Sequence, residues 1–357
     1  MPPIPEEGPL FSLVERLPDP LFLGPLLLAW PYFALRYGGI GVSACANPGI
    51  KNGGWCNESK EETLAILGPY GKGFVAAHAT LEVTGAEDDL ARAEEARERA
   101  GLSYPIVAKP DVGRNGRGVK ILHSSPELAA YLKRFPRGQR LMLQRYIEDE
   151  GEAGVFYARL PGEARGRITS LTLKYFPHVT GDGRASLREL ILRDPRASRI
   201  AEVYLRRHSP EELARIPSEG ERVRLVSVGN YVRGSVFVDG APHVSEAMTD
   251  AFDRIVREAD GFHFGRFDVR FRDLEDLKAG RNFHIIELNG AGSQPTHLFD
   301  RRMTLFGAYR TTLAHWNLSF RIGAANRTQG ARKLGALELW REFRKELKLL
   351  SAQPDEE

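Results

Sequence analysis

The segment IVAKPDVGRNGRGV at residues 106–119 constrains the fold more than any other part of the sequence. It places a lysine and a proline at the end of one apolar run, then a glycine-rich loop, then a second apolar run. Glycines let backbone N–H groups approach an anion closely, and a lysine at the base of the loop adds a point charge. The candidate phosphate-binding residues are Lys109, Gly113, Gly116 and Gly118. The segment predicts either a phosphate site between two strands or an ordinary glycine-containing hairpin.

Strand and helix patterns are interspersed along the rest of the chain, which predicts the α+β class with a mixed or antiparallel sheet. Strand patterns are at residues 104–108, 119–122, 141–147, 168–176, 222–228, 266–271 and 282–288. Helical patterns are at residues 88–100, 128–135, 187–218, 251–259 and 336–350. The hydrophobic content of 42% and charged content of 27% exclude a disordered chain. A net charge of +3 gives no reason to expect a nucleic-acid partner.

Three hard oxygen donors are predicted to share one strand face, namely Asp268, Glu287 and Asn289. Glu287 and Asn289 are two residues apart on one strand, so both point to the same face, and a paired strand would bring Asp268 beside them. Carboxylate and amide oxygens of this kind suit Mg²⁺ together with nucleotide phosphates. Arg266 shares that face. A surface ladder of ion pairs is the alternative, although carboxylates in apolar strands need partners.

Together the two candidate sites resemble the ATP–Mg²⁺ site of the ATP-grasp superfamily, particularly the D-alanine–D-alanine ligase branch of carboxylate–amine ligases. The matching motifs are ESK at 58–60, YPIVAKP at 104–110, GRNGRGV at 113–119, LQRYI at 143–147, LKY at 173–175, GRFDVRF at 265–271 and IIELNG at 285–290. The segment VTGDGRASLRELI at 179–191 is also similar to a loop of the cyanophycin synthetase grasp domain. The resemblance implies a short N-terminal subdomain at 1–87, a central lid subdomain at 88–156, a C-terminal grasp subdomain at 157–330, and a C-terminal helix and tail at 331–357.

The resemblance implies a role for each matching position. The residues that would contact ATP phosphates are Lys60, Lys109 and Lys174, beneath a mobile loop at 113–118. The residues that would contact adenine and ribose are Gln144, Tyr146, Ile147 and Glu152. The residues that would hold Mg²⁺ are Asp268, Glu287 and Asn289. Arg266 would stabilise the charge of a tetrahedral intermediate, so Arg266 and Lys109 are the predicted catalytic residues.

The sequence departs from the family where D-alanine would bind. The segment GAGSQPTHLFD at 290–300 replaces the usual Pro-Gly-Met-Thr turn, and the glutamate that holds the first D-alanine has no clear match. We therefore expect a different carboxylate substrate, in a pocket formed by Asn230, Arg233, Ser293 and His297.

The expected activity is an ADP-forming ligase that converts a carboxylate into an acyl phosphate and joins it to an amine. A grasp-fold kinase and a non-catalytic ATP-binding regulatory protein are the alternatives. The identity of both substrates, an amine or thiol as nucleophile, and a homodimeric state are left open.

The apolar stretch at residues 21–35 is too short for a membrane span and contains Pro25 and Pro31. It is predicted to be a buried core segment or an interdomain cover, with loose docking on a membrane surface as the alternative. The apolar stripe along 336–350 is predicted to be core or interface packing. Two cysteines, Cys45 and Cys56, form no disulfide framework, which favours a cytoplasmic protein.

Overall fold

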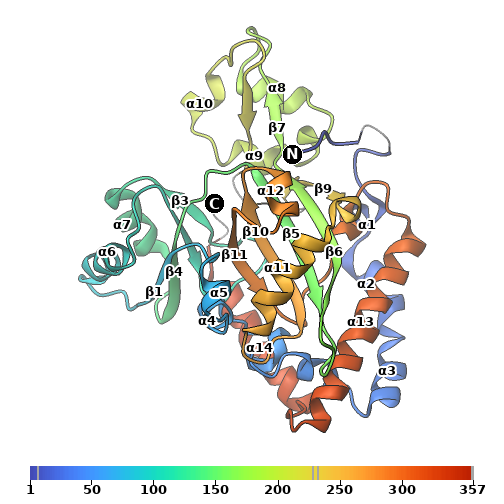
Figure 1. Ribbon diagram of the computed structural model, residues 1–357. Coiled ribbons are helices and arrows are strands. Elements are labelled where there is room, and N and C mark those ends of the chain that lie inside the picture. The colour runs from blue at the N-terminus through green and yellow to red at the C-terminus, as the bar shows by residue number, and fades with distance from the viewer. Residues whose placement is uncertain (6–7, 227–228, 231–232, 355–357) are drawn as a thin grey trace.

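A computed structural model describes residues 1–5, 8–226, 229–230 and 233–354 of the chain. Two antiparallel sheets dominate the structure (Figure 1). The small sheet has the order β1 (His78–Val83), β4 (Gln139–Arg145), β2 (Ile106–Pro110) and β3 (Lys120–Leu122). The large sheet has the order β11 (Phe283–Asn289), β10 (Phe264–Phe271), β5 (Gly151–Ala158), β6 (Arg167–Tyr175) and β9 (Val236–Asp239). The predicted α+β class with an antiparallel sheet is confirmed.

Two helices cover one face of the small sheet, α6 (Asp89–Arg99) and α7 (Ser125–Arg134). The predicted helix at 88–100 ends as expected at Gly101, whose φ of 64° lies in the left-handed region that favours glycine. Leu128 and Leu132 of α7 pack with the strand residues Leu122 and Leu141. The predicted strands at 104–108, 119–122 and 141–147 all belong to this sheet.

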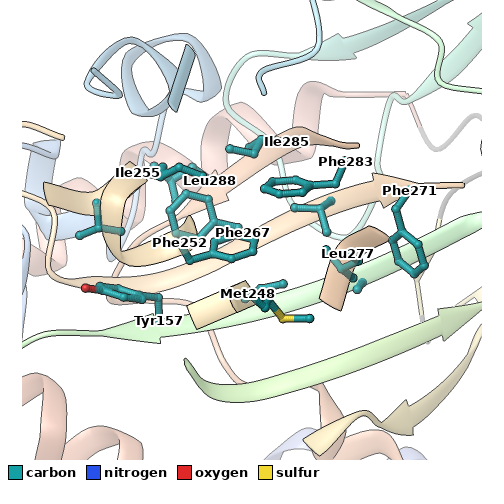
Figure 2. Packing of buried hydrophobic residues seen from close by; sticks show 14 of the residues in the cluster. Tyr157, Met248, Phe252, Ile255, Phe267, Phe271, Leu277, Phe283, Ile285 and Leu288 are labelled. Atoms are coloured by element: carbon teal, nitrogen blue, oxygen red, sulfur yellow. The ribbon is translucent and has the colours of Figure 1, made fainter. Parts of the chain in front are cut away.

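The large sheet buries one face under α11 (Glu246–Arg257) and α12 (Leu274–Lys278) (Figure 2). Phe267 and Phe271 of β10 point into this core, where they meet Phe252 of α11 and Phe283 of β11. Each fully buried side chain of this size contributes about 1.5–3 kcal/mol. Val269 enters the same core. Because side chains alternate along a strand, Asp268 and Arg270 face the opposite side of the sheet.

A third lobe lies beyond one end of the large sheet, at the top of Figure 1. It contains β7 (His178–Thr180) paired with β8 (Arg222–Arg224), and the helices α8 (Leu187–Arg193), η3 (Ala197–Ile200), α9 (Ala201–Leu205) and α10 (Pro210–Ala214). Val179, Leu187 and Tyr204 belong to its separate hydrophobic cluster. The prediction of a helix-rich segment at 187–218 is confirmed. Residues 227–228 of the predicted strand at 222–228, and 231–232 of the hairpin beside Arg233, lie outside the described residues.

The N-terminal helices pack on the long helix α13 (Leu305–Thr328). They are α1 (Leu13–Arg16), α2 (Asp19–Leu27) and α3 (Trp30–Tyr37). The prediction of a buried segment at 21–35 holds only for the inner face, because Phe22 and Phe33 are buried whereas Leu28 and Leu35 are more than 80% exposed. No helix among the described residues is long and apolar enough to cross a membrane.

Short helices connect these layers. They are η1 (Val42–Ala46), η2 (Lys51–Gly54), α4 (Lys60–Ala65), α5 (Pro69–Lys72), η5 (Ala241–His243) and η6 (Thr296–Phe299). η1 lies directly against α13 at Gly323, where a Cβ atom would come within 2.0 Å of the Val42 carbonyl oxygen. Only glycine allows this approach between the two backbones.

The C-terminal helix α14 (Ala336–Ala352) does not form the core packing that was one alternative for 336–350, and interface packing stays a prediction. Its apolar stripe is exposed, with Leu337, Trp340 and Leu347 at 58%, 54% and 48% exposure, whereas Glu346 is buried. The helix therefore docks through an acidic edge instead of its apolar face.

The predicted subdomain limits stay a prediction, and the strands of the two sheets are distributed around them as follows. β1 at 78–83 belongs to the small sheet although it precedes the predicted limit at 88, and β5 at 151–158 belongs to the large sheet although the predicted lid extends to 156.

An ion pair between Glu61 of α4 and His78 of β1 joins the two parts of the molecule. Glu61 Oε2 lies 3.3 Å from His78 Nε2, which lowers the pKa of Glu61 to about 2 and raises the pKa of His78. The carboxylate stabilises the fold above its ordinary pKa of 4.5 and loses this effect as the pH falls toward 2. The imidazolium stabilises the fold below its ordinary pKa of 6.5 and loses this effect as the pH rises through the higher folded value.

We expect Glu61→Gln to lower the free energy of unfolding by about 1 kcal/mol near pH 5.5, and by less near pH 9. Urea denaturation at the two pH values measures the difference. Glu62→Gln changes an exposed glutamate in the same first turn of α4 and is the control. An equal loss at both pH values would contradict the role of the ion pair.

Candidate active site

A cleft of about 530 Å³ lies between the small and the large sheet. Its walls include β2 and β3 of the small sheet, the cleft face of the large sheet, the glycine-rich loop at 113–118, and residues 292–299. The predicted nucleotide, metal and catalytic residues come from both sheets and the residues just after β4, from α4 and from the glycine-rich loop. All of them line the cleft except Gly118.

The cleft face of the large sheet is charged because β10 alternates strictly. Arg266, Asp268 and Arg270 face the cleft, while the intervening residues enter the core. The register pairs Asp268 with Glu287 and Arg266 with Asn289. The predicted pairing of these strands is confirmed.

Asp268 is the centre of a buried charge network. Its carboxylate accepts hydrogen bonds from Lys174 Nζ at 2.9 Å and from Arg266 Nε and Nη2 at 2.9 and 3.1 Å. Burial alone would raise the pKa of Asp268, but Arg266 and Lys174 outweigh it and hold the pKa well below its usual range. The group is therefore ionised at neutral pH.

Glu152 extends the same network toward β6. Lys174 Nζ donates to Glu152 Oε1 at 3.0 Å, and Arg270 Nε lies 3.0 Å from Glu152 Oε2. Burial would raise the pKa of Glu152, but the two cations lower it overall. Both carboxylate oxygens are thus engaged by cations, in the place where the resemblance implies a ribose contact.

The backbone carbonyl of a β-bulge in β11 accepts hydrogen bonds from side chains of the small sheet across the cleft. The register of β10 with β11 shifts between Asp268 and Val269, which leaves Ile286 as the extra residue. Its carbonyl oxygen accepts from Lys109 Nζ at 3.0 Å and from Gln144 Nε2 at 3.3 Å. Lys109 Nζ also donates to Gln144 Oε1 at 2.8 Å, so Gln144 here positions the lysine. Burial lowers the pKa of Lys109 to about 8.

Lys60 enters the cleft from the first turn of α4. Ser59 caps this helix by accepting from Glu62 N, and its hydroxyl donates to Asp111 Oδ2 at 2.7 Å. Lys60 Nζ lies 3.3 Å from the Gly113 carbonyl oxygen and 3.8 Å from Glu287 Oε1. The lysine therefore lies between the glycine-rich loop and the carboxylate of Glu287.

Glu58 is a cleft residue to which the sequence analysis assigned no role. Its Oε1 accepts from Gly290 N at 2.6 Å, and burial raises its pKa to about 8. The signal was present in the ESK motif, where only the lysine received a role. The tight segment at 290–292 brings the backbone close enough for this contact.

Hydrogen bonds from distant parts of the chain hold the glycine-rich loop and the residue before it. Arg233 Nη2 donates to the Gly116 carbonyl oxygen at 2.8 Å. Arg114 forms a bidentate pair with Glu346 of α14, at 2.7 Å for Nε–Oε1 and 3.0 Å for Nη2–Oε2. Gln353 Nε2 donates to the Val112 carbonyl oxygen at 2.7 Å. The C-terminal helix thus contacts the loop that the sequence predicts to close over phosphates.

The predicted substrate residues are divided between the cleft and its surroundings. Among the described residues, those that line the cleft include Asn230 and Ser293 but not Arg233 or His297. His297 Nδ1 lies 2.6 Å from Ser170 Oγ, and burial lowers its pKa. Ser293 Oγ donates to the Gly290 carbonyl oxygen at 2.6 Å.

The predicted metal donors fit a magnesium ion by chemistry and by register. Asp268, Glu287 and Asn289 present oxygens on one face of two paired strands, and Glu287 lies 3.8 Å from its Lys60 partner. No group of three or more His, Cys, Asp or Glu residues suited to a metal occurs in the part of the chain that the structure describes. The predicted set differs from such a group because it has two carboxylates and one amide, and it stays a prediction.

No family model and no curated protein matches the chain. Solved structures that match it include a bifunctional glutathione synthetase from Pasteurella multocida, with 17% identity over 72% of this chain and a TM-score of 0.36. The D-cycloserine synthetase DcsG matches with 14% identity over 75% of this chain, covering 69% of its own length, and a TM-score of 0.39. The VanG D-Ala:D-Ser ligase from Enterococcus faecalis matches with 10% identity over 80% of this chain, covering 62% of its own length, and a TM-score of 0.40.

These three solved structures are named as ligases or synthetases. The chain spans only 35% of the length of the matched glutathione synthetase.

The contact between Arg114 and Glu346 predicts that α14 restrains the glycine-rich loop. We expect Glu346→Ala to raise amide hydrogen exchange at residues 113–118 about tenfold, because hydrogen bonds to charged groups contribute about 1.5–3 kcal/mol. Glu338→Ala, on the same helix and paired with the exposed Arg332, is the control. Unchanged exchange in Glu346→Ala would show that α14 does not hold the loop.

Proposed function

We propose that the protein is an ATP- and Mg²⁺-dependent ligase of the ATP-grasp type, which activates a carboxylate as an acyl phosphate and joins it to an amine. The observation that carries this proposal is the convergence of Lys60, Lys109, Lys174 and Arg266 with Asp268 and Glu287 in one cleft between two antiparallel sheets. Cations that face a cleft beside metal-binding carboxylates match the needs of phosphoryl transfer.

The nucleotide would lie between the two sheets. Val107, Ile121 and Ile147 provide apolar surface for the adenine ring at the small sheet, and Tyr146 lies beside them. Lys60, Lys109 and the loop at 113–118 would contact the phosphates. The low pKa of Asp268 keeps a negative charge available beside them.

Asp268, Glu287 and Asn289 would hold Mg²⁺. The ion, when bound, neutralises charge on the phosphate oxygens during transfer. Lys174 and Arg266 donate hydrogen bonds to the carboxylate of Asp268. Their positive charges remain fixed, which lowers the electrostatic cost of bringing an anionic carboxylate next to an anionic phosphate.

The reaction then has two steps. A carboxylate oxygen of the substrate attacks the γ-phosphorus of ATP, the bond to ADP breaks, and an acyl phosphate forms. The amine nitrogen next attacks the acyl carbon, phosphate leaves with the bonding electrons, and the nitrogen loses a proton. Arg266 donates two hydrogen bonds to Asp268 and one to the Gln294 carbonyl oxygen at 2.9 Å. It is thereby fixed where negative charge would develop on the tetrahedral intermediate.

Hydroxylamine tests this activity without knowledge of the natural amine, because it attacks acyl phosphates to give hydroxamates. We expect the protein to form ADP and a hydroxamate with at least one member of a pool of amino acids and small carboxylates. Coupled ADP detection and colorimetric hydroxamate detection measure the two products. ADP with a stable phosphorylated product and no hydroxamate would indicate a kinase, and ATP binding without ADP formation would contradict catalysis.

Glu287→Gln tests the metal assignment. We expect it to reduce ADP formation about 100-fold or more, because a metal ligand stabilises the transition state by several kcal/mol. The variant should also lose the Mg²⁺-dependent rise in melting temperature with a non-hydrolysable ATP analogue. Glu95→Gln, in an exposed pair with Arg99 on α6, is the control. Retention of most of the activity by a folded Glu287→Gln protein would refute the assignment.

A further inference from the structure

The cleft has an apolar end that the phosphoryl-transfer residues do not use. It is lined by side chains from the N-terminal helices, from β9 and from η6, namely Val14, Leu17, Phe22, Leu23, Phe237 and Phe299. These residues line the same continuous cleft as Arg266 and Asp268. The nucleotide-facing residues of the small sheet and the N-terminal helices therefore form different walls of one cavity.

The change from charged to apolar surface follows the strand order of the large sheet. Across the cleft face the register pairs Asp268 with Gly154 of β5, and Glu152 of β5 with Lys174 of β6. Lys174 pairs in turn with Phe237 of the edge strand β9. Directly opposed residues of an antiparallel pair lie on the same face of the sheet. The charged face thus ends at Lys174, and the apolar end begins with the next strand.

Phe237 and the chain after Thr296 extend this apolar surface. The ring centroids of Phe237 and Phe299 are 5.9 Å apart in an edge-to-face arrangement. Thr296 lies at the other end of η6 and also lines the cleft. Gly154 leaves room for both neighbours, since a Cβ atom there would lie 3.0 Å from Arg266 Cδ and 3.2 Å from Thr296 Oγ1. The apolar end of the cleft therefore lies next to Arg266.

Contacts with the third lobe, with η6 and with α13 hold the N-terminal wall in position. Ser12 and Glu15 form a capping box at α1, and Glu15 Oε1 lies 2.7 Å from Arg196 Nη2 of the third lobe. Val14 and Phe22 pack with Leu298 and Ala308 in one hydrophobic cluster. Among the described N-terminal residues that line the cleft, Glu15 has the only carboxylate, and that carboxylate is paired with Arg196. The wall therefore presents apolar groups to the cavity.

We propose that the activated carboxylate substrate carries an apolar group, aliphatic or aromatic, that lies against Leu23 and Phe237 while its carboxylate lies beside Arg266. The proposal rests on the proposed ligase function and specifies its substrate class. A small polar amino acid would leave this end of the cavity without apolar contact. Each methylene of the substrate that is buried there contributes about fourfold in kcat/KM, because burial of one methylene is worth about 0.8 kcal/mol.

Straight-chain carboxylates from propionate to octanoate, with ATP, Mg²⁺ and hydroxylamine, test the proposal. We expect kcat/KM for hydroxamate formation to rise about fourfold for each added methylene until the cavity is filled. Leu23→Trp fills the apolar end and should reduce the ratio of octanoate to propionate activity tenfold or more. Leu28→Trp places the same residue on the outer side of this helical segment, where Leu28 is 81% exposed, and should keep the wild-type ratio.

The outcomes separate this proposal from the proposed function. Hydroxamate formation without a preference for longer chains, or equal ratios in Leu23→Trp and Leu28→Trp, would overturn the apolar subsite and leave the ligase function standing. Lack of ADP and hydroxamate with every carboxylate would count against the ligase function itself. Calorimetry of octanoate and propionate binding, in the presence of a non-hydrolysable ATP analogue, tests the subsite without turnover. If octanoate binds no tighter than propionate, or binds as tightly to Leu23→Trp as to Leu28→Trp, the binding measurement would also overturn the apolar subsite.

Discussion

The buried charges on the cleft face of the large sheet are the constraint on which the rest of the structure depends. Lys174 Nζ lies 2.9 Å from Asp268 and 3.0 Å from Glu152, and Arg266 holds the other side of Asp268. A buried charge without its partner is strongly destabilising, so β5, β6 and β10 have to pair in one register. The same cost explains why the opposite face of these strands is so apolar, since that core supplies the stability on which the charged face depends.

The cleft combines this fixed charge with contributions from distant parts of the chain. The bulge at Ile286 turns a carbonyl oxygen toward Lys109 and so connects the two sheets. Glu346 of the C-terminal helix pairs with the glycine-rich loop, and the N-terminal helices form the apolar end. Both ends of the chain therefore contribute to a site whose charged centre lies in the middle of the sequence. Under the proposed function, this arrangement would let these terminal segments influence loop mobility and substrate choice without changing the residues that would contact phosphate.

Several elements were predictable because their signals are local. The β10 sequence alternates charged and apolar residues, and the pairing of Asp268 with Glu287 followed from it. β5 escaped prediction because all its residues are buried, so it shows no polar alternation, and two glycines weaken its strand signal. The core alternative for the stripe on α14 was wrong for a different reason. A helical period shows that one face is apolar, but not that anything covers it.

The sequence alone determined the strand–lysine–glycine segment, the shared face of Glu287 and Asn289, and the α+β class, because strand and turn preferences act over a few residues. Only the tertiary structure decided that Arg233 contacts the loop carbonyl of Gly116, that Glu58 enters the cleft, and that the helices at the N-terminus close its apolar end. These contacts join residues more than a hundred positions apart, with Glu58 and Gly290 as an example. No local pattern encodes such a contact, because it depends on which surfaces the packing of the whole chain brings together.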